Sequence, residues 1–308
     1  MKKFRLVFLA LIALLSLCAI LVGCGSFQKG SKGLTFVSNG DGTCSLWGIG
    51  ECTDVEVVVP SKSPDGDKVT AVAKGAFKKN DTIASIHLPA SVEVIEEEAF
   101  SGCSRLLRVT FAEDSKLVEM KDGAFSSCKE LTAITLPDGL TKIGGGAFSV
   151  CQALTSITIP AGVTEIPSST FCYCYDLSEV TFAEGSRLQS IGANAFTECA
   201  LTKINIPSTV TELGSAALYG CNFTSFSLPS KVTVITQHQF CATHELTDLY
   251  LHKDVTKIED YAFLKSENMT IHYEGSKADW TAIEMTPSAL SMQNGKLTII
   301  CTDGTIEG

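Results

Sequence analysis

The chain has 308 residues, with 24 lysines and arginines against 34 aspartates and glutamates, so its formal net charge is -10. This acidic balance argues against nucleic acid as a partner, because binding to phosphates requires a basic surface. Hydrophobic residues make up 45% of the chain, which excludes a wholly disordered protein and is enough for a packed core.

Residues 1–23 are predicted to be a signal peptide. Basic residues at the start precede an apolar run over 6–22, and small residues follow it. The end of the segment, Leu21-Val22-Gly23-Cys24, resembles the lipobox of bacterial lipoproteins. This resemblance implies cleavage before Cys24 and lipidation of its thiol, with residues 24–33 as lipidated cysteine and flexible tether. An ordinary signal peptide or an uncleaved anchor is the alternative, because the run approaches the length of a membrane span.

Residues 34–54 are expected to form an N-terminal hairpin cap. The segment Asn39-Gly40-Asp41-Gly42 is typical of a tight turn between two short strands. Cys44 and Cys52 are a candidate disulfide across this hairpin, since conditions outside the cytoplasm permit such bonds.

Residues 55–273 repeat one unit about nine times. Equivalent apolar positions recur every 22–25 residues, and most of them are phenylalanines preceded by alanine: Phe77, Phe100, Phe125, Phe148, Phe171, Phe196, Leu218, Phe240 and Phe263. Within one unit, Ile157-Thr158-Ile159 alternates as a half-buried strand does, and Pro160 ends it. A second short extended piece contains Val163 and Ile166. Units this short must stack on one another to bury their apolar side.

The full pattern, L-T-x-I-x-L-P-x-x-V-T-x-I-G-x-x-A-F-x-x-C, resembles the BspA-like leucine-rich repeat family. The resemblance implies a β-rich, right-handed solenoid with short parallel strands and capping elements. It also implies a bacterial surface or secreted protein, since several members of that family act in adhesion. The units around Phe111 and Phe182 carry two extra residues, which should bulge one loop. One residue is missing after Cys199 and after Cys221, which predicts tighter turns there.

Residues 274–308 are expected to form the C-terminal cap. Ser276 and Asp279 have the spacing of a helix N-cap pair, so a short helix should begin there. Trp280 and Ile283 would cover the last turn of the solenoid, and residues 296–301 would form a final strand.

Six cysteines fall three residues after the repeated phenylalanine position: Cys103, Cys128, Cys151, Cys174, Cys199 and Cys221. Stacking would place neighbours in this column about 4.8 Å apart, a distance that permits disulfides in principle. We favour a buried column of small, weakly polar side chains, because side chains in a ladder run parallel. His238, Cys241 and His244 have zinc-like spacing, but they supply only three ligands, so no metal site is expected.

The solvent side of the first strand of each unit is a candidate binding face, because solenoids offer long surfaces to partners. It is mostly lined by hydroxyl groups, which also simply suit strands. The residues chosen as the candidate face are Arg108, Thr110, Thr135, Thr158, Thr181, Asn205 and Tyr250.

The sequence contains no catalytic triad, zincin motif, phosphate loop or dinucleotide fingerprint, so neither an enzyme nor a cofactor is predicted. We expect a lipid-anchored, extracytoplasmic and surface-exposed protein that mediates protein–protein or adhesive interactions. Its partners would be proteins or glycans of a host, a matrix or the cell envelope. A structural scaffold lipoprotein with partners in the same cell is the alternative.

Overall fold

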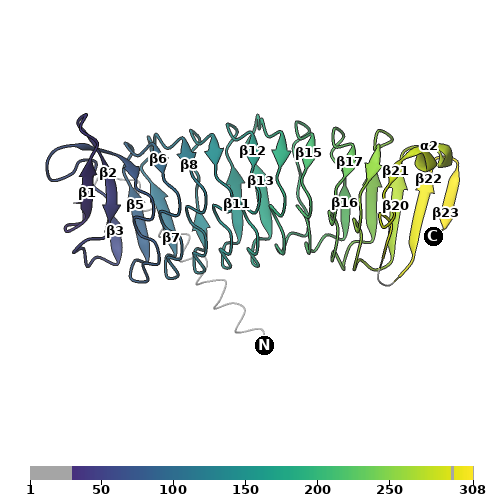
Figure 1. Ribbon diagram of the computed structural model, residues 1–308, viewed down its shortest axis with the longest axis horizontal. Coiled ribbons are helices and arrows are strands. Elements are labelled where there is room, and N and C mark those ends of the chain that lie inside the picture. Colours follow the sequence, from purple (N-terminus) through teal and green to yellow (C-terminus); the bar gives the residue numbers. More distant parts are fainter. Residues whose placement is uncertain (1–29, 293–294, 308) are drawn as a thin grey trace, which may run out of the picture. The chain divides into compact units, whose positions relative to one another are not determined.

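The computed structural model describes residues 30–292 and 295–307 and places the repeats in a β-solenoid of about 11 turns (Figure 1). The solenoid predicted from the sequence is thus confirmed, with a slightly higher number of turns than the nine repeats. The difference arises because two strands that follow the turn of Phe263, β20 (Met269–Tyr273) and β22 (Leu297–Cys301), pair in the same parallel register as the repeat strands. Among the described residues, no helix has the length and apolar character needed to cross a membrane.

Each turn, apart from the one that contains residues 203–206, contributes a first strand to one side of the solenoid. These strands are β3 (Glu56–Val58), β5 (Ser85–Leu88), β7 (Arg108–Phe111), β9 (Ala133–Ile134), β11 (Ser156–Ile159), β13 (Glu179–Phe182), β16 (Ser225–Ser227), β18 (Asp248–Leu251), β20 (Met269–Tyr273) and β22 (Leu297–Cys301). Alternate residues point into the core, as in β11, where Ile157 and Ile159 are buried and Ser156 and Thr158 are exposed.

A second series of shorter strands forms another side. It comprises β2 (Thr43–Gly48), β4 (Lys68–Val72), β6 (Val94–Ile95), β8 (Glu119–Met120), β10 (Lys142–Ile143), β12 (Glu165–Ile166), β14 (Ser190–Ile191), β15 (Glu212–Leu213), β17 (Val234–Ile235), β19 (Lys257–Ile258) and β21 (Glu284–Met285). The second residue of each two-residue strand in the series is buried, apart from Met285 in β21.

The turn that carries the repeated phenylalanine, hereafter the Phe turn, forms the third side. Its phenylalanines are buried, and the rings from Phe77 to Phe196 stack with centroids 5.0–5.5 Å apart and planes within 9° of parallel. Backbone N–H groups of each Phe turn donate to carbonyl groups of the next one, as Phe125 N does to Ala147 O at 2.8 Å. These bonds join every consecutive pair of Phe turns from Phe77 to Phe263.

The two strand sides, by contrast, are interrupted. On the first side the hydrogen-bonded sheets are β3-β5-β7-β9, β11-β13 and β16-β18-β20-β22-β23. On the second side, ladders end between β10 and β12 and again between β15 and β17. Residues 203–206 form no first strand in their turn, although their sequence fits the repeat. One residue is missing after Cys199 in that turn, so the deletion coincides with the loss of strand pairing.

The turn at Leu218 compensates for its missing phenylalanine. Phe226 and Phe223 stand where other turns have smaller aliphatic residues, as at Leu249 and Leu246 of the next turn. Their rings lie 5.4 Å apart, and the Phe226 ring lies 5.2 Å from that of Phe240. Aromatic volume is therefore supplied from the first strand instead of the Phe turn.

Both ends of the solenoid carry caps. At the amino-terminal end, β1 (Thr35–Ser38) pairs antiparallel with β2, and the turn between them is Asn39 to Gly42. At the other end, α2 (Lys277–Ala282) begins with a capping box between Ser276 and Asp279, and its Trp280 is buried. The strand β23 (Gly304–Glu307) pairs antiparallel with β22 and covers the last edge (Figure 1).

Candidate functional site

The predicted face residues lie where the sequence placed them, on the exposed side of the first strands or their equivalents. Thr110, Thr135, Thr158, Thr181 and Asn205 are all exposed. The face is not one continuous sheet, however, because the interruptions divide it into three parts. Thr158 and Thr181 pair in the short middle sheet, where their hydroxyl groups lie 2.8 Å apart.

The amino-terminal part of the face contains Arg108. Its guanidinium lies 3.4 Å from a carboxylate oxygen of Glu56, so the charge is partly satisfied within the chain. In the same sheet, His87 on β5 pairs in register with Thr110 on β7, and the Nδ1 atom of His87 lies 3.0 Å from the hydroxyl of Thr110. Burial lowers the pKa of His87, which favours the neutral imidazole.

The carboxyl-terminal part contains a strip of three larger side chains, which we call the C-terminal strip. Tyr250, His272 and Ile300 stand in register on β18, β20 and β22. The rings of Tyr250 and His272 stack with centroids 4.5 Å apart and planes 11° apart. Tyr250 is 45% exposed and Ile300 is 41% exposed, so the strip is open to a partner.

Asp248 holds the imidazole of the strip in place. His272 Nε2 lies 2.7 Å from Asp248 Oδ1, and the hydroxyl of Thr247 donates to the other carboxylate oxygen at 2.7 Å. These two hydrogen bonds, the one with His272 first, lower the pKa of Asp248. The stacked orientation of Tyr250 is thus supported by a hydrogen-bonded neighbour.

Sequence reasoning found Tyr250 but overlooked His272 and Ile300 as members of one surface. Ile300 carried a usable signal, since Ile299 and Ile300 are consecutive apolar residues in a strand and must point to opposite sides. Ile299 is buried, which leaves Ile300 outside. The pairing of His272 with Asp248 depends on register between turns, which the sequence fixes only approximately.

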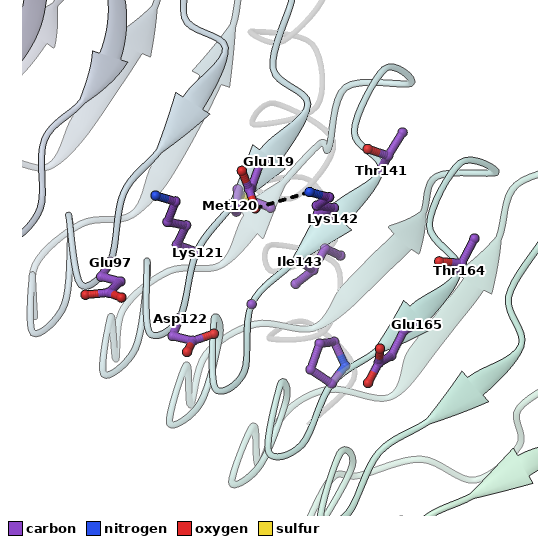
Figure 2. A pocket seen from close by; sticks show the side chains of 12 residues that line it. Glu97, Glu119, Met120, Lys121, Asp122, Thr141, Lys142, Ile143, Thr164 and Glu165 are labelled. Carbon is purple, nitrogen blue, oxygen red and sulfur yellow. Dashed lines mark ion pairs between the residues drawn. The ribbon is translucent and has the colours of Figure 1, made fainter.

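Figure 2 shows a hollow on the second strand side, with a volume of about 440 Å³, at the interruption between β10 and β12. Carboxylates outnumber lysines in it, but most are already engaged. Lys142 Nζ lies 3.8 Å from Glu119, and Asp122 accepts a hydrogen bond from Gly145 N at 2.7 Å. Glu97 is paired with Lys74. The hollow therefore has the character of a solvated, ion-paired groove.

The cysteine column forms a ladder of weak hydrogen bonds inside the Phe turns. Each of the six thiols donates to the carbonyl of the phenylalanine one turn earlier, with sulfur–oxygen distances of 3.0–3.3 Å. All six are free cysteines. Burial raises the pKa of the Cys174 thiol to about 12, so the group stays protonated and able to donate. Ser266, three residues after Phe263, makes the same bond to Phe240 at 2.8 Å.

Other candidates from the sequence are not brought together. Cys44 and Cys52 are free cysteines, and Cys44 Sγ instead lies 3.6 Å from the carbonyl of Asp67, so the structure gives no support to their pairing. The buried thiol of Cys241 and the exposed His244 do not converge with His238, whose ring stacks on Tyr261. Within the described ranges there is no cluster of metal ligands. Cys24, the predicted lipidation site, and the signal segment lie outside the described residues.

Comparison with known proteins identifies the repeat. The family model described as "BspA type Leucine rich repeat region" matches residues 70–187 and 166–279, with six copies. No curated protein matches the chain. A leucine-rich cell surface protein from Faecalibacterium prausnitzii has a similar solved structure, with a TM-score of 0.58 and 22% identity. That match covers 85% of this chain and 98% of the other.

Two further solved structures are more distant. The leucine-rich repeat protein of T. pallidum is 24% identical over 72% of this chain and 80% of its own, with a TM-score of 0.42. The pneumococcal vaccine antigen PcpA is 17% identical over 86% of this chain and 87% of its own, with a TM-score of 0.49.

Proposed function

Because the chain belongs to the BspA-type leucine-rich repeat family, we propose that it is a lipid-anchored protein of the bacterial cell surface that binds other proteins through its first strand side. Leucine-rich repeat domains generally mediate protein–protein interactions. The family and the solenoid fold are typically non-enzymatic, and we propose no catalytic role. The expected partners are proteins or glycans of a host, a matrix or the cell envelope.

One observation supports the binding surface most directly. The C-terminal strip presents Tyr250, His272 and Ile300 side by side on a face otherwise rich in small hydroxyl residues. Tyrosine is enriched among the residues that contribute most to binding energy, and apolar contacts around it exclude water. Arg108 lies in another sheet of the same side and is the second candidate anchor.

Membrane attachment is supported by the sequence pattern ending at Cys24. Two or three acyl chains hold a protein stably on a membrane, whereas one chain does so marginally. We expect radiolabelled palmitate to be incorporated into the full chain and to be lost in Cys24→Ala. Protease treatment of intact cells then tests orientation. Cleavage would support a surface adhesin, and protection would favour the alternative scaffold that faces the envelope of the same cell.

The binding proposal is tested with the full chain against a panel of matrix and cell-envelope proteins. For any saturable partner, Tyr250→Ala should weaken binding at least about tenfold, as expected for a central anchor. Tyr261→Ala is the matched control, since Tyr261 is 38% exposed but lies next to Phe263 on the Phe turn. Equal losses in both variants, or no loss in either, would contradict the assignment of this surface.

A further inference from the structure

The interruption of the first strand side at residues 203–206 leaves a hollow in the face. Its volume is about 380 Å³, and it is lined by Lys203, Ile204, Asn205, Ile206, Ser225, Phe226, Ser227 and Pro229. Ile204 and Ile206 are only half-buried, whereas the equivalent Ile157 and Ile159 are buried. The core is therefore partly open at this turn.

Unused hydrogen-bonding groups surround the hollow. Within the part of the chain that the structure describes, the backbone N–H and C=O groups of residues 203–206 have no hydrogen-bond partner. The hydroxyl groups of Ser225 and Ser227 and the amide of Asn205 also form no intramolecular hydrogen bond there. Such groups are free to bind the hydroxyl groups of a ligand.

Tyr250 stands on β18, one strand beyond the residues of β16 that line this hollow. It pairs in register with Ser227, whose side chain is too small to cover the neighbouring ring. One face of the Tyr250 ring is occupied by His272 on β20, so the other face is turned towards β16 and the hollow. The exposed face of the Tyr250 ring is thus directed over the small side chains of Ser225 and Ser227.

The charges on the two sides of the hollow are opposite. Lys203 is exposed and has no ion-pair partner among the described residues. Asp248 pairs in register with Ser225 and lies on the Tyr250 side. A ligand above Ser225 would therefore meet a cation on one side and a carboxylate, with its hydrogen-bonded imidazole, on the other.

We propose that this hollow binds a pyranose sugar that carries a carboxylate, as part of an acidic glycan. The apolar C–H face of a pyranose stacks on an open aromatic ring, and Tyr250 offers one at the right orientation. The spacing between strands, about 4.8 Å per turn, places a ring stacked at about 4 Å from Tyr250 directly above Ser225 and Ser227. The sugar carboxylate then faces Lys203, and its hydroxyl groups reach Asn205, the serines and the free backbone groups. This inference rests on the proposed function and deepens it, since it names one class of glycan among the expected partners.

The test compares acidic saccharides with neutral counterparts: a methyl ester, which removes the charge of each carboxylate, and lactose, which lacks the sialic acid unit. The full chain is titrated with trigalacturonate and with its methyl ester, and with sialyllactose and lactose, and binding is followed by NMR. We expect each acidic saccharide to saturate the site and to bind up to about fivefold more tightly than its neutral counterpart, the effect of one exposed ion pair. Shifted amide signals should lie at residues 203–206 and 225–227.

Variants separate the contributions. Tyr250→Ala should abolish saturation by all four saccharides, whereas Tyr250→Phe should retain it. Lys203→Met should remove only the preference for the acidic saccharides, and Lys142→Met on the second strand side should leave that preference intact. Ile300→Ser, on the far side of His272, should weaken a protein partner but not a saccharide, so failure of one proposal is distinguishable from failure of the other.

The proposal is overturned if neither acidic saccharide saturates the site, or if Tyr250→Ala binds as the unchanged chain does. Equal affinity for acidic and neutral saccharides overturns the assignment of Lys203. If the peptide LTSITIP, copied from residues 154–160, shifts the same amides and the saccharides do not, the hollow is a polypeptide site instead.

Discussion

The exchange of aromatic volume between Leu218 and Phe226 leads to a sharp prediction. Restoring the consensus with Leu218→Phe should not stabilise the protein, although the phenylalanine of each of the eight other Phe turns stacks on a phenylalanine of a neighbouring turn. Leu218 is fully buried, and the Phe226 ring already packs 5.2 Å from Phe240 in the adjoining space. Adding a ring there overpacks the core, which costs about 1–3 kcal/mol.

The reciprocal change should also destabilise. Phe226→Ile removes aromatic volume from a residue that is 5% exposed, and we expect a cost of about 1–2 kcal/mol, below the ~3–5 kcal/mol of truncating phenylalanine to alanine. In the double variant, the new ring at position 218 should occupy the space that Phe226 vacates. Its free energy of unfolding should therefore return to within about 1 kcal/mol of the parent.

Urea denaturation of the full chain, followed by circular dichroism, measures all four proteins of this cycle. The expected coupling between the two positions is therefore at least about 1 kcal/mol. A stabilised Leu218→Phe variant would refute the reasoning, and so would effects of the two substitutions that simply add. Phe148→Leu is the control, because its ring stacks on both neighbours and has no compensating partner, so it should destabilise.

Two further predictions concern hydrogen bonds between turns. Cys151→Ser should be tolerated better than Cys151→Ala, because a hydroxyl can still donate to Phe125 O, as Ser266 does to Phe240 O. We expect the alanine variant to lose about 1–2 kcal/mol in the free energy of unfolding, measured by thermal or chemical denaturation. A serine variant less stable than the alanine variant would contradict this. The second concerns Asp248, whose lowered pKa means that its contribution to stability is present above the ordinary value of 3.8 and is lost as the pH falls through the lower folded value. His272→Ala should raise the pKa of Asp248 towards 3.8 in an NMR titration, and an unchanged value would show that Thr247 alone holds it.

Much of the fold could be predicted from the sequence because the same pattern of apolar residues recurs in every repeat. Alternation in segments such as Ile157-Thr158-Ile159 fixes which side faces the core, and the regular phenylalanine spacing fixes the stacking. The surface required more. The joining of His272 to Asp248 and of Tyr250 to His272 depends on register across turns separated by 22–24 residues, and a hydroxyl-rich strand does not reveal where pairing will stop.

The interruptions themselves illustrate this limit. A single missing residue after Cys199 pointed to a tighter turn, which is a local effect. The actual consequence is longer in range, since residues 203–206 lose pairing with the strands on both sides. At the interruption between β9 and β11 the sequence has no deletion, and nothing in the sequence of those turns explains why strand pairing stops there.

The unequal bonding of the three sides has a mechanical consequence. Between β9 and β11, and between residues 203–206 and β16, neighbouring turns are held mainly by the Phe turns and the core, because the ladders of both strand sides are interrupted there. If the chain is held at its amino terminus and gripped near Tyr250, as proposed, tension crosses both places in series. The solenoid would then yield in blocks, and each turn that pulls free would lengthen the chain by up to about 75–85 Å. Such stepwise extension would dissipate load while the remaining blocks, and the contact at Tyr250, stay intact.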